Sequence, residues 1–353
     1  MPYKVIQWAT GNVGKHALRA LIEHPDYELV GLWVHSPDKV GKDAGELAGL
    51  GKIGVVATND VDEIIKMKAD CVSYMANADL RPADAIDDMA RCLRSGKNVV
   101  STSVPFLTYP KTAPRVLVEP LEQACKAGGT SCFTSAIDPG FANDLIPLVL
   151  MGVCERVESV RILEILNYST YYNATTLFDI MGFGQPLDQT PLLLQRGNLK
   201  FAWGCVVDMM ADALDVQLDE VREVYERVPA EKTFEVALGT VKAGTAAGLR
   251  FEVQGIVKGR PKIVVEHVTR MHDEVAPHWP QGTGSGSYRV IIEGSPSLNC
   301  DFHLRGADGD HNTGGLCASG MRVLNAIPAV CAAKPGLLST LDLPIFTARH
   351  VMR

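Results

Sequence analysis

The first turn of the chain constrains its fold more than any other feature of the sequence. A strand-like run at residues 5–8 leads directly into Ala9-Thr10-Gly11-Asn12-Val13-Gly14, and an amphipathic helical pattern continues to residue 24. The small residues fit the G-x-G-x-x-G pattern of dinucleotide-binding βαβ units, with Ala9 in place of the first glycine. They let the backbone approach a pyrophosphate, toward which the helix N–H groups point. We expect this turn to bind a nicotinamide cofactor; the alternative is an ordinary tight turn between strand and helix.

The rest of the first 135 residues alternates between strand-like and helix-like patterns. Strands separated by helices of ordinary length pair in parallel through right-handed crossovers. We therefore predict an α/β fold, with a Rossmann-type doubly wound parallel sheet in residues 1–140. The predicted strands are 3–8, 27–34, 54–57, 71–76, 98–101 and 130–134, and the predicted helices are 12–24, 61–67, 81–95 and 113–127.

The pattern changes after Pro139-Gly140, where long strands broken by turns become dominant. The turn Lys258-Gly259-Arg260-Pro261 is a hairpin signal, and successive hairpins predict a mostly antiparallel sheet. We expect an α+β substrate domain over residues 141–306, and a C-terminal helix and tail over 307–353 that return to the first domain. The predicted strands are 157–166, 233–238, 249–258, 262–271, 288–292 and 299–304, and the predicted helices are 142–151, 206–226 and 315–333.

Composition limits the classes of function. The 353 residues suit two domains, and a formal net charge of −7 without a run of Lys or Arg argues against nucleic-acid binding. The nine cysteines contain no C-x-x-C pair, so we predict no metal site and reduced thiols. No signal peptide is recognisable, and the apolar stretch 145–153 is too short to span a bilayer. We expect a cytoplasmic protein that binds neither membranes nor nucleic acid.

The end of the second predicted strand bears on the choice of cofactor. NAD enzymes usually place an acid there to bind the ribose 2′-OH, whereas this strand ends Trp-Val-His-Ser-Pro-Asp-Lys at residues 33–39. Ser36, Lys39 and Lys42 would suit a 2′-phosphate, so we favour NADP, while Asp38 leaves NAD possible. The predicted cofactor-binding residues are Ala9, Thr10, Gly11, Asn12, Val13, Gly14, His35, Ser36, Lys39, Ala76 and Asn325.

Three segments together resemble a known group of proteins. They are the turn at 8–14, Asp138-Pro139-Gly140-Phe141 and Asn325-Ala326-Ile327-Pro328. In this order they resemble the dihydrodipicolinate-reductase-like superfamily, and within it the native amine dehydrogenases and 2,4-diaminopentanoate dehydrogenase. The resemblance implies NAD(P)H-dependent reduction of imines formed from small ketones or aldehydes and ammonia, with oxidative deamination as the reverse. It also implies a homodimer built through the sheet of the second domain, which is then a dimerisation domain too.

The chain departs from the superfamily at two places. Dihydrodipicolinate reductases carry E-x-x-H-H followed by a lysine, whereas here Glu164 is followed by residues 165–172 without histidine or lysine. This difference argues against the reductase reaction itself. Amine dehydrogenases place a glutamate in the loop after the strand equivalent to 98–101, and the loop 102–106 here has no acid. Either another group replaces it, or the substrate differs, or amine chemistry is weak.

Reduction of a C=N or C=O bond needs a proton donor within hydrogen-bond reach of the acceptor. His267 lies in a predicted strand whose alternation places Val265, His267 and Thr269 on one face. Glu164 shares its face with Ile162 and Leu166, so burial would raise its pKa. We name Glu164 and His267 as catalytic candidates; the alternatives are a histidine bonded within the sheet or interface and a solvated glutamate.

A cluster of aromatic residues follows the strand that holds Glu164. Aromatic side chains suit the wall of a small apolar pocket, although packing in a core or interface is an equal alternative. Alternative functions are a carbonyl reductase of the same fold that does not use ammonia, and a non-catalytic dinucleotide-binding sensor. The predicted pocket residues are Ser103, Tyr168, Tyr171, Tyr172, Phe178 and Phe183.

Overall fold

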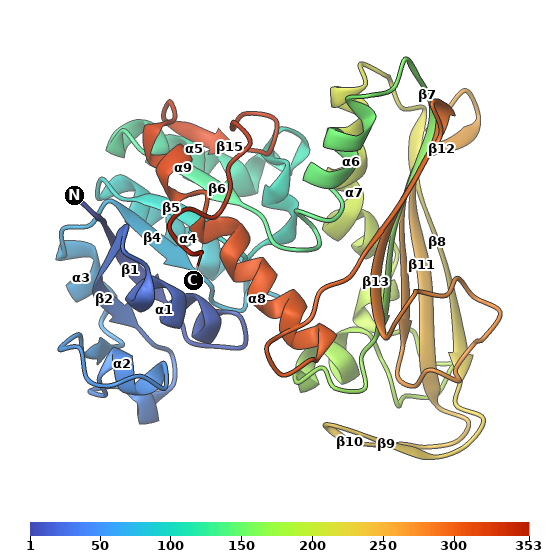
Figure 1. The fold of residues 1–353 in the computed structure, drawn as a ribbon, viewed down its shortest axis with the longest axis horizontal. Coiled ribbons are helices and arrows are strands. Elements are labelled where there is room, and N and C mark those ends of the chain that lie inside the picture. Colours follow the sequence, from blue (N-terminus) through green and yellow to red (C-terminus); the bar gives the residue numbers. More distant parts are fainter. Residues whose placement is uncertain (353) are drawn as a thin grey trace. The chain divides into compact units, whose positions relative to one another are not determined.

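The computed structural model describes residues 1–352 and divides the chain into two compact units (Figure 1). Unit 1 consists of Met1–Ile137 together with the chain from Leu316 onward, and unit 2 is Asp138–Gly315. The expected boundaries at 140 and 306 lie three and nine residues from these positions. Each unit is described separately below.

Unit 1 contains a seven-stranded sheet in which every pairing is parallel, in the order β15-β6-β5-β4-β1-β2-β3. The predicted doubly wound sheet is confirmed, and β15, which pairs with β6, was not predicted. The strands are β1 (Tyr3–Trp8), β2 (Tyr27–Trp33), β3 (Ala57–Thr58), β4 (Cys71–Tyr74), β5 (Asn98–Ser101), β6 (Ser131–Thr134) and β15 (Gly336–Leu338).

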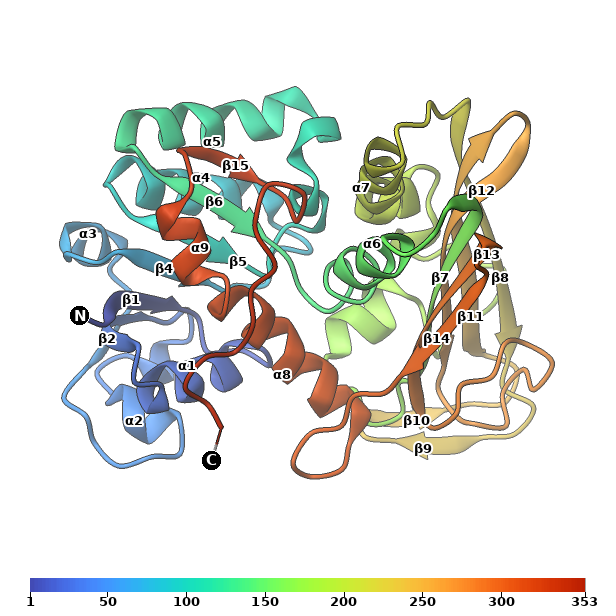
Figure 2. The same cartoon turned by 45° about the horizontal axis from the view of Figure 1, so that its top comes forward.

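Helices cover both faces of this sheet, because successive side chains of each strand point to opposite sides. Val5 packs with α1 (Gly14–Glu23), α8 (His311–Leu324) and α9 (Ile327–Ala332). Its neighbour Ile6 packs with α3 (Val61–Lys66), α4 (Pro82–Arg94) and α5 (Arg115–Gly128) on the opposite face (Figure 2). The short elements are α2 (Ala44–Leu47) and 3-10 turns at Pro37–Lys39, Pro105–Thr108 and Pro110–Thr112.

The C-terminal apolar segment forms two helices rather than the single predicted helix 315–333. The break falls at Asn325-Ala326, just before Ile327-Pro328 starts α9. The segment His311–Ala332 has the length of a membrane span and contains an 18-residue window with a mean hydropathy of 1.3. Leu324, Ile327 and Val330 are nevertheless buried in the core of unit 1, so packing accounts for the apolar composition.

Unit 2 is built on a six-stranded sheet in the order β14-β13-β7-β12-β11-β8. Within this sheet, β7 and β12 pair in parallel and the other neighbours pair antiparallel, which confirms the mostly antiparallel sheet. As predicted, a two-residue turn joins β11 to β12; its residues, Lys258 and Gly259, both have positive φ. The strands are β7 (Arg156–Asn167), β8 (Glu220–Pro229), β11 (Ala246–Val257), β12 (Arg260–Arg270), β13 (Gly286–Ser295) and β14 (Leu298–Phe302), with a separate hairpin of β9 (Phe234–Val236) and β10 (Gly239–Val241).

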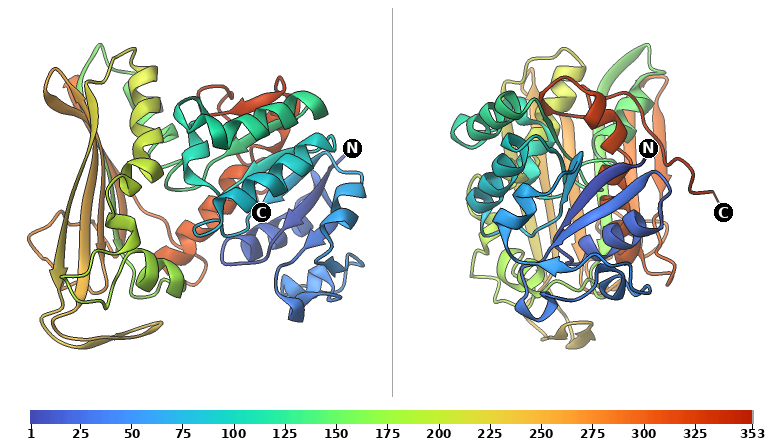
Figure 3. Two further views of the ribbon diagram at one scale, coloured as in Figure 1. Left: turned by 180° about the vertical axis from the view of Figure 1, so that it is seen from behind. Right: turned by 90° about the vertical axis from the view of Figure 1, so that its left-hand side faces the viewer.

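One face of this sheet is covered by α6 (Leu145–Met151) and α7 (Asn198–Ala213), as Figures 1 and 3 show. A π-helical turn at Thr175–Ile180 and a 3-10 turn at Leu192–Leu194 complete unit 2. The strand register places Tyr288 of β13, Glu164 of β7, His267 of β12 and Phe251 of β11 in one row across the sheet. Residues opposite one another in register share a face, so these four side chains lie on the same side.

The predicted helix 206–226 is wrong beyond Ala213, because residues 220–229 form the edge strand β8. Within the predicted helix, Val221 and Val224 are three residues apart, a spacing that also occurs on one face of a helix. Pairing with β11 along the length of β8 determines the structure instead. An edge strand with both faces largely exposed lacks the alternation that would have identified it.

Candidate active site

The turn at residues 9–14 has the backbone geometry that its motif requires. Ala9 adopts φ +77°, a left-handed conformation that glycine provides without strain. A Cβ added to Gly14 would lie 2.3 Å from the carbonyl oxygen of Ala9, so the start of α1 lies too close to the turn for any side chain there. A Cβ on Gly11 would meet nothing within 4 Å. The turn is therefore closed where helix and strand pack and open at Gly11, as a pyrophosphate-binding turn should be.

The predicted 2′-phosphate residues lie on the loop after β2. The ammonium of Lys39 donates to the hydroxyl of Thr10 at 3.0 Å, so this loop contacts the turn directly. Ser36 is half-buried, whereas His35 and Asp38 are exposed. The structure thus brings Lys39 and Thr10 together.

Two further predicted residues, Ala76 and Ser103, lie beyond the carboxyl ends of β4 and β5. The hydroxyl of Ser103 donates to the carbonyl of Ala76, and its backbone N–H donates to Ser101 Oγ at 2.9 Å. Both residues are buried. The carboxyl ends of the strands are where open α/β sheets bind their ligands, but the Ser103 hydroxyl already has a partner within unit 1.

The prediction that Asn325 reaches the cofactor needs correction. The neighbouring carbonyl of Leu324 accepts a hydrogen bond, at 2.7 Å, from the hydroxyl of Tyr27, which is the first residue of β2. Asn325 therefore lies at the amino-terminal edge of the parallel sheet, opposite the edge that binds ligands. The part of α8 beside the turn is Gly320, where an added Cβ would meet Val13 at 3.4 Å.

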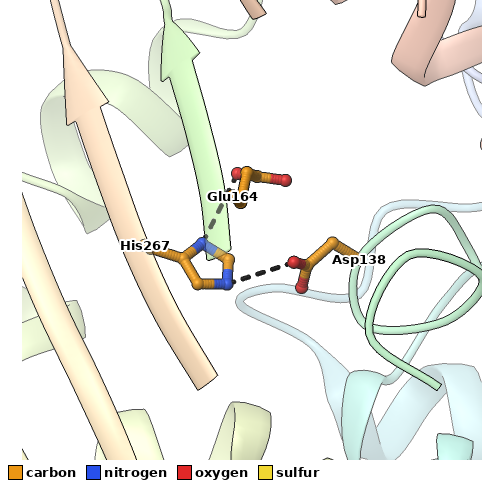
Figure 4. A group of neighbouring side chains, drawn as sticks. All are labelled: Asp138, Glu164 and His267. Atoms are coloured by element: carbon orange, nitrogen blue, oxygen red, sulfur yellow. Dashed lines mark ion pairs between the residues drawn. The ribbon is translucent and has the colours of Figure 1, made fainter. Parts of the chain in front are cut away.

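The two catalytic candidates lie together in unit 2 with an acid that had been given no role. Glu164 of β7 and His267 of β12 are opposite each other in register, and Asp138 reaches them from the start of the unit (Figure 4). His267 Nδ1 lies 3.4 Å from Glu164 Oε1, and Nε2 lies 3.2 Å from Asp138 Oδ2. The three side chains are only 4–6% exposed. We call these three residues the imidazole cluster.

The sequence contained one signal for Asp138, because this acid opens the Asp138-Pro139-Gly140-Phe141 motif after the last strand of the first domain. Its contact with His267 depends on tertiary packing, which the sequence does not reveal. The Nε2–Oδ2 approach is an ion pair rather than a well-aligned hydrogen bond. A divalent ion would need ligand atoms that converge on one point, whereas the imidazole lies between the carboxylates and turns a different nitrogen to each.

Neighbouring side chains hold each member of the cluster. The hydroxyl of Tyr168 donates to Glu164 Oε1 at 3.2 Å, and the indole N–H of Trp203 donates to Asp138 Oδ1 at 2.7 Å. The ring of Phe251 stacks on the imidazole at 4.5 Å between centroids and 14° between planes. An aromatic face beside a cation is stabilising.

These contacts favour a protonated His267. Burial opposes its charge, but the carboxylates of Asp138 and Glu164 outweigh burial and raise the pKa of His267 to about 10. Burial raises the pKa of Glu164 above its ordinary value, against the opposing effect of the imidazolium. Burial and the Glu164 charge also raise the pKa of Tyr168 and of Tyr288. His267 is therefore charged near neutral pH, and Glu164 holds a proton more tightly than an ordinary carboxyl group does.

The aromatic residues predicted to line a pocket occupy different environments. Tyr168 and Tyr171 stack at 4.8 Å, and Tyr168 reaches the cluster. Tyr172 is 66% exposed and Phe178 is half-buried. Phe183 is fully buried and belongs to the packing of unit 2. Of this group, Tyr168 makes a hydrogen bond to Glu164.

Replacing Gly11 with leucine should separate cofactor binding from folding. The new side chain meets no protein atom but fills the space above the turn, so we expect NADPH affinity to fall at least about tenfold with an unchanged thermal midpoint. Titration of NADPH fluorescence measures the loss. The Gly14→Ala variant is the contrast, because its Cβ clashes with backbone and should lower stability. Retained affinity in Gly11→Leu would place the cofactor elsewhere.

Replacing His267 with glutamine should leave two buried carboxylates without a compensating charge, at a cost of about 3–5 kcal/mol at pH 7. The raised pKa of His267 contributes stability that is complete below pH 6.5 and is lost as the pH rises through about 10. The difference in unfolding free energy between wild type and variant should therefore shrink from pH 7 to pH 10. Urea unfolding measures it, with the exposed His278→Gln as control, and a constant difference would contradict a charged His267.

Comparisons with known proteins bear on the identity of both units. Residues 5–104 match the family model for the N-terminus of dihydrodipicolinate reductase, and residues 141–352 match that for the C-terminal domain of 2,4-diaminopentanoate dehydrogenase. An amine dehydrogenase of Streptomyces virginiae is 40% identical over 344 residues, covering 96% of each chain. A 2,4-diaminopentanoate dehydrogenase of Acetoanaerobium sticklandii is 26% identical, covering 97% of this chain and 93% of that protein.

Among solved structures, an amine dehydrogenase from Mycobacterium smegmatis superimposes with a TM-score of 0.80 at 21% identity, covering 99% of this chain and 98% of that one. At this identity the superposition shows a shared fold. The resemblance expected from the three sequence segments is confirmed by the matches over nearly the whole chain. The chain therefore belongs to the family of the amine dehydrogenases and 2,4-diaminopentanoate dehydrogenase, and it is an NAD(P)-dependent oxidoreductase with a Rossmann-type cofactor domain.

Proposed function

We propose that this enzyme is an NADP-preferring amine dehydrogenase in which Glu164 exchanges the proton with the substrate nitrogen. The imidazole cluster is the observation that carries the proposal. It provides a buried carboxyl group with a raised pKa in a chain whose loop 102–106 has no acid. The 40% identical relative named amine dehydrogenase supports the same reaction class. The substrates are an imine formed from a small ketone or aldehyde and ammonia and, in reverse, the corresponding primary amine.

The cofactor supplies or accepts a hydride at the substrate carbon, and the protein orients the substrate and manages its proton. In the reductive direction, the Glu164 carboxyl gives its proton to the imine nitrogen, and the carbon accepts the hydride. The product is the amine together with an ionised Glu164. In the oxidative direction, the carboxylate takes the proton back from the amine.

His267 stabilises the charge that forms on Glu164. Its two ring nitrogens face Glu164 and Asp138, so neither N–H is available to a substrate in this arrangement. The imidazolium instead lowers the cost of ionising Glu164 inside the protein, and Asp138 keeps the imidazole charged. With both carboxylates ionised the cluster carries a net negative charge, which favours a cationic iminium or ammonium group beside it.

The position of Asp138 in the chain agrees with this role. It comes four residues after Thr134, the last residue of β6, and ligands of open α/β sheets bind beyond the carboxyl ends of the strands. A short segment of chain thus joins Asp138 to the last residue of β6.

A homodimer formed through the sheet of unit 2 and a cytoplasmic location are part of the same proposal. No helix of unit 2 covers the face of the sheet opposite α6 and α7 in the described residues (Figure 3), which leaves a surface for a second subunit. All nine cysteines are free thiols, as expected for a reducing compartment.

Replacing Glu164 with glutamine should reduce kcat for reductive amination by about 10²–10⁴-fold, the usual value of a positioned proton donor. The amide keeps the shape and cannot ionise, so NADPH binding should be unchanged. Steady-state oxidation of NADPH with a panel of small ketones and ammonia measures the effect, and Glu158→Gln on the exposed part of the same strand is the control. Undiminished turnover in Glu164→Gln would mean that another group exchanges the proton with the substrate nitrogen.

Ammonia dependence of the wild type separates the proposed reaction from simple carbonyl reduction. Oxidation of NADPH by a ketone should require ammonia in the same assay. Turnover that is equal without ammonia would identify a carbonyl reductase instead.

Replacing Lys39 with alanine should raise Kd for NADPH about tenfold and leave NADH nearly unaffected, because a surface phosphate contact is worth roughly 1.5–3 kcal/mol when charge-assisted. Lys39 supports the NADP preference because its ammonium already lies against Thr10 of the turn. Fluorescence titration with both cofactors measures the change, with the exposed Lys68→Ala as control. Tighter binding of NADH than NADPH by the wild type would overturn the preference.

A further inference from the structure

Trp203 of α7 contacts two members of the imidazole cluster. Its indole N–H donates to Asp138 Oδ1 at 2.7 Å. Its ring meets the imidazole of His267 edge-on, with centroids 4.7 Å apart and planes at 64°. No sequence pattern singles out this tryptophan, because it lies within an apolar helix.

The two oxygens of Asp138 have separate partners. Oδ1 accepts the indole N–H, and Oδ2 faces His267 Nε2 at 3.2 Å. A carboxylate fixed at one oxygen has little freedom to rotate, so the hydrogen bond from Trp203 determines where the other oxygen points. The ion pair with His267 and the hydrogen bond from Trp203 thus hold the carboxylate at its two oxygens.

The position of Trp203 is itself well determined. Glu223 of β8 accepts hydrogen bonds from the backbone N–H groups of Gly197 and Lys200, which caps the first turn of α7. Phe251 packs against the indole at 4.9 Å and also stacks on His267. The hydrogen bonds at the start of α7 and the contact with Phe251 of β11 therefore fix the position of the tryptophan.

We propose that Trp203 is a positioning residue, which orients the Asp138 carboxylate toward His267 and thereby maintains the charged imidazole on which Glu164 depends. The expected effect of Trp203 on kcat rests on the proposed function. Its expected effect on the titration of His267 does not involve a substrate. The ionisable groups that face the imidazole are the carboxylates of Asp138 and Glu164, with the phenols of Tyr168 and Tyr288 beyond Glu164. Trp203 itself does not ionise, so it acts through Asp138.

The Trp203→Phe variant tests this role, because phenylalanine keeps an aromatic ring and removes the N–H. Imidazole ¹⁵N NMR of the enzyme without substrate should show His267 titrating about one pH unit lower than in the wild type, equivalent to a tenfold weaker preference for the charged form. The alkaline limb of the kcat profile should move in the same direction. We expect kcat to fall about tenfold with KM nearly unchanged.

Phe201→Leu, an exposed position on the same helix, is the control and should leave the titration of His267 unchanged. If Trp203→Phe does not fold, benzothienylalanine at position 203 retains the shape of tryptophan without the N–H and replaces it in the same experiment. An unchanged His267 titration in the folded variant would overturn the inference. A shifted titration in an enzyme that lacks amine activity would support it and would contradict the proposed function alone.

Discussion

The positive charge of the protonated His267 ring compensates the carboxylates of Asp138 and Glu164 inside unit 2. The candidate site depends on this compensation. Transfer of an unpaired carboxylate from water into a protein interior costs several kcal/mol even after relaxation. Two such groups lie within 3.4 Å of one ring, so each is tolerable only while the ring is protonated. Phe251 and the cluster's own hydrogen bonds exclude water and strengthen this pairing. The same arrangement accounts for the raised pKa of His267, and burial accounts for the raised pKa of Glu164.

Strand register is the link between the sequence and this arrangement. A shift of one residue between β7 and β12 would place Glu164 and His267 on opposite faces of the sheet. The turn at Lys258-Gly259 fixes β12 against β11, and the parallel pairing of β12 with β7 aligns the two residues. A short turn eight residues before His267 thus contributes to the geometry of the cluster.

Much of this architecture was accessible from local patterns. The alternation of strands and helices predicted the parallel sheet, and the conformation of Ala9 agrees with a motif read from residues 9–14. Glu164 and His267 were selected by type and strand face. Asp138 and Trp203 were not, because their roles arise from contacts between residues far apart in the sequence. Strand β8 was missed because its valines follow a helical spacing that strand pairing overrides.

The absence of an acid from the loop 102–106 has a structural counterpart. The loop is tied to the sheet through Ser101 and Ser103, whose hydroxyls bond to backbone groups, and Val104 adopts φ +63°. These interactions fix the backbone without presenting an ionisable group. The carboxyl group of Glu164 lies on a strand of the sheet, opposite His267 in register. Because the strand already orients it, little reorganisation free energy is needed when the reaction occurs. We infer that in this chain Glu164, on the sheet of unit 2, transfers the proton. Tyr168 and His267 both contact the same oxygen of its carboxyl group.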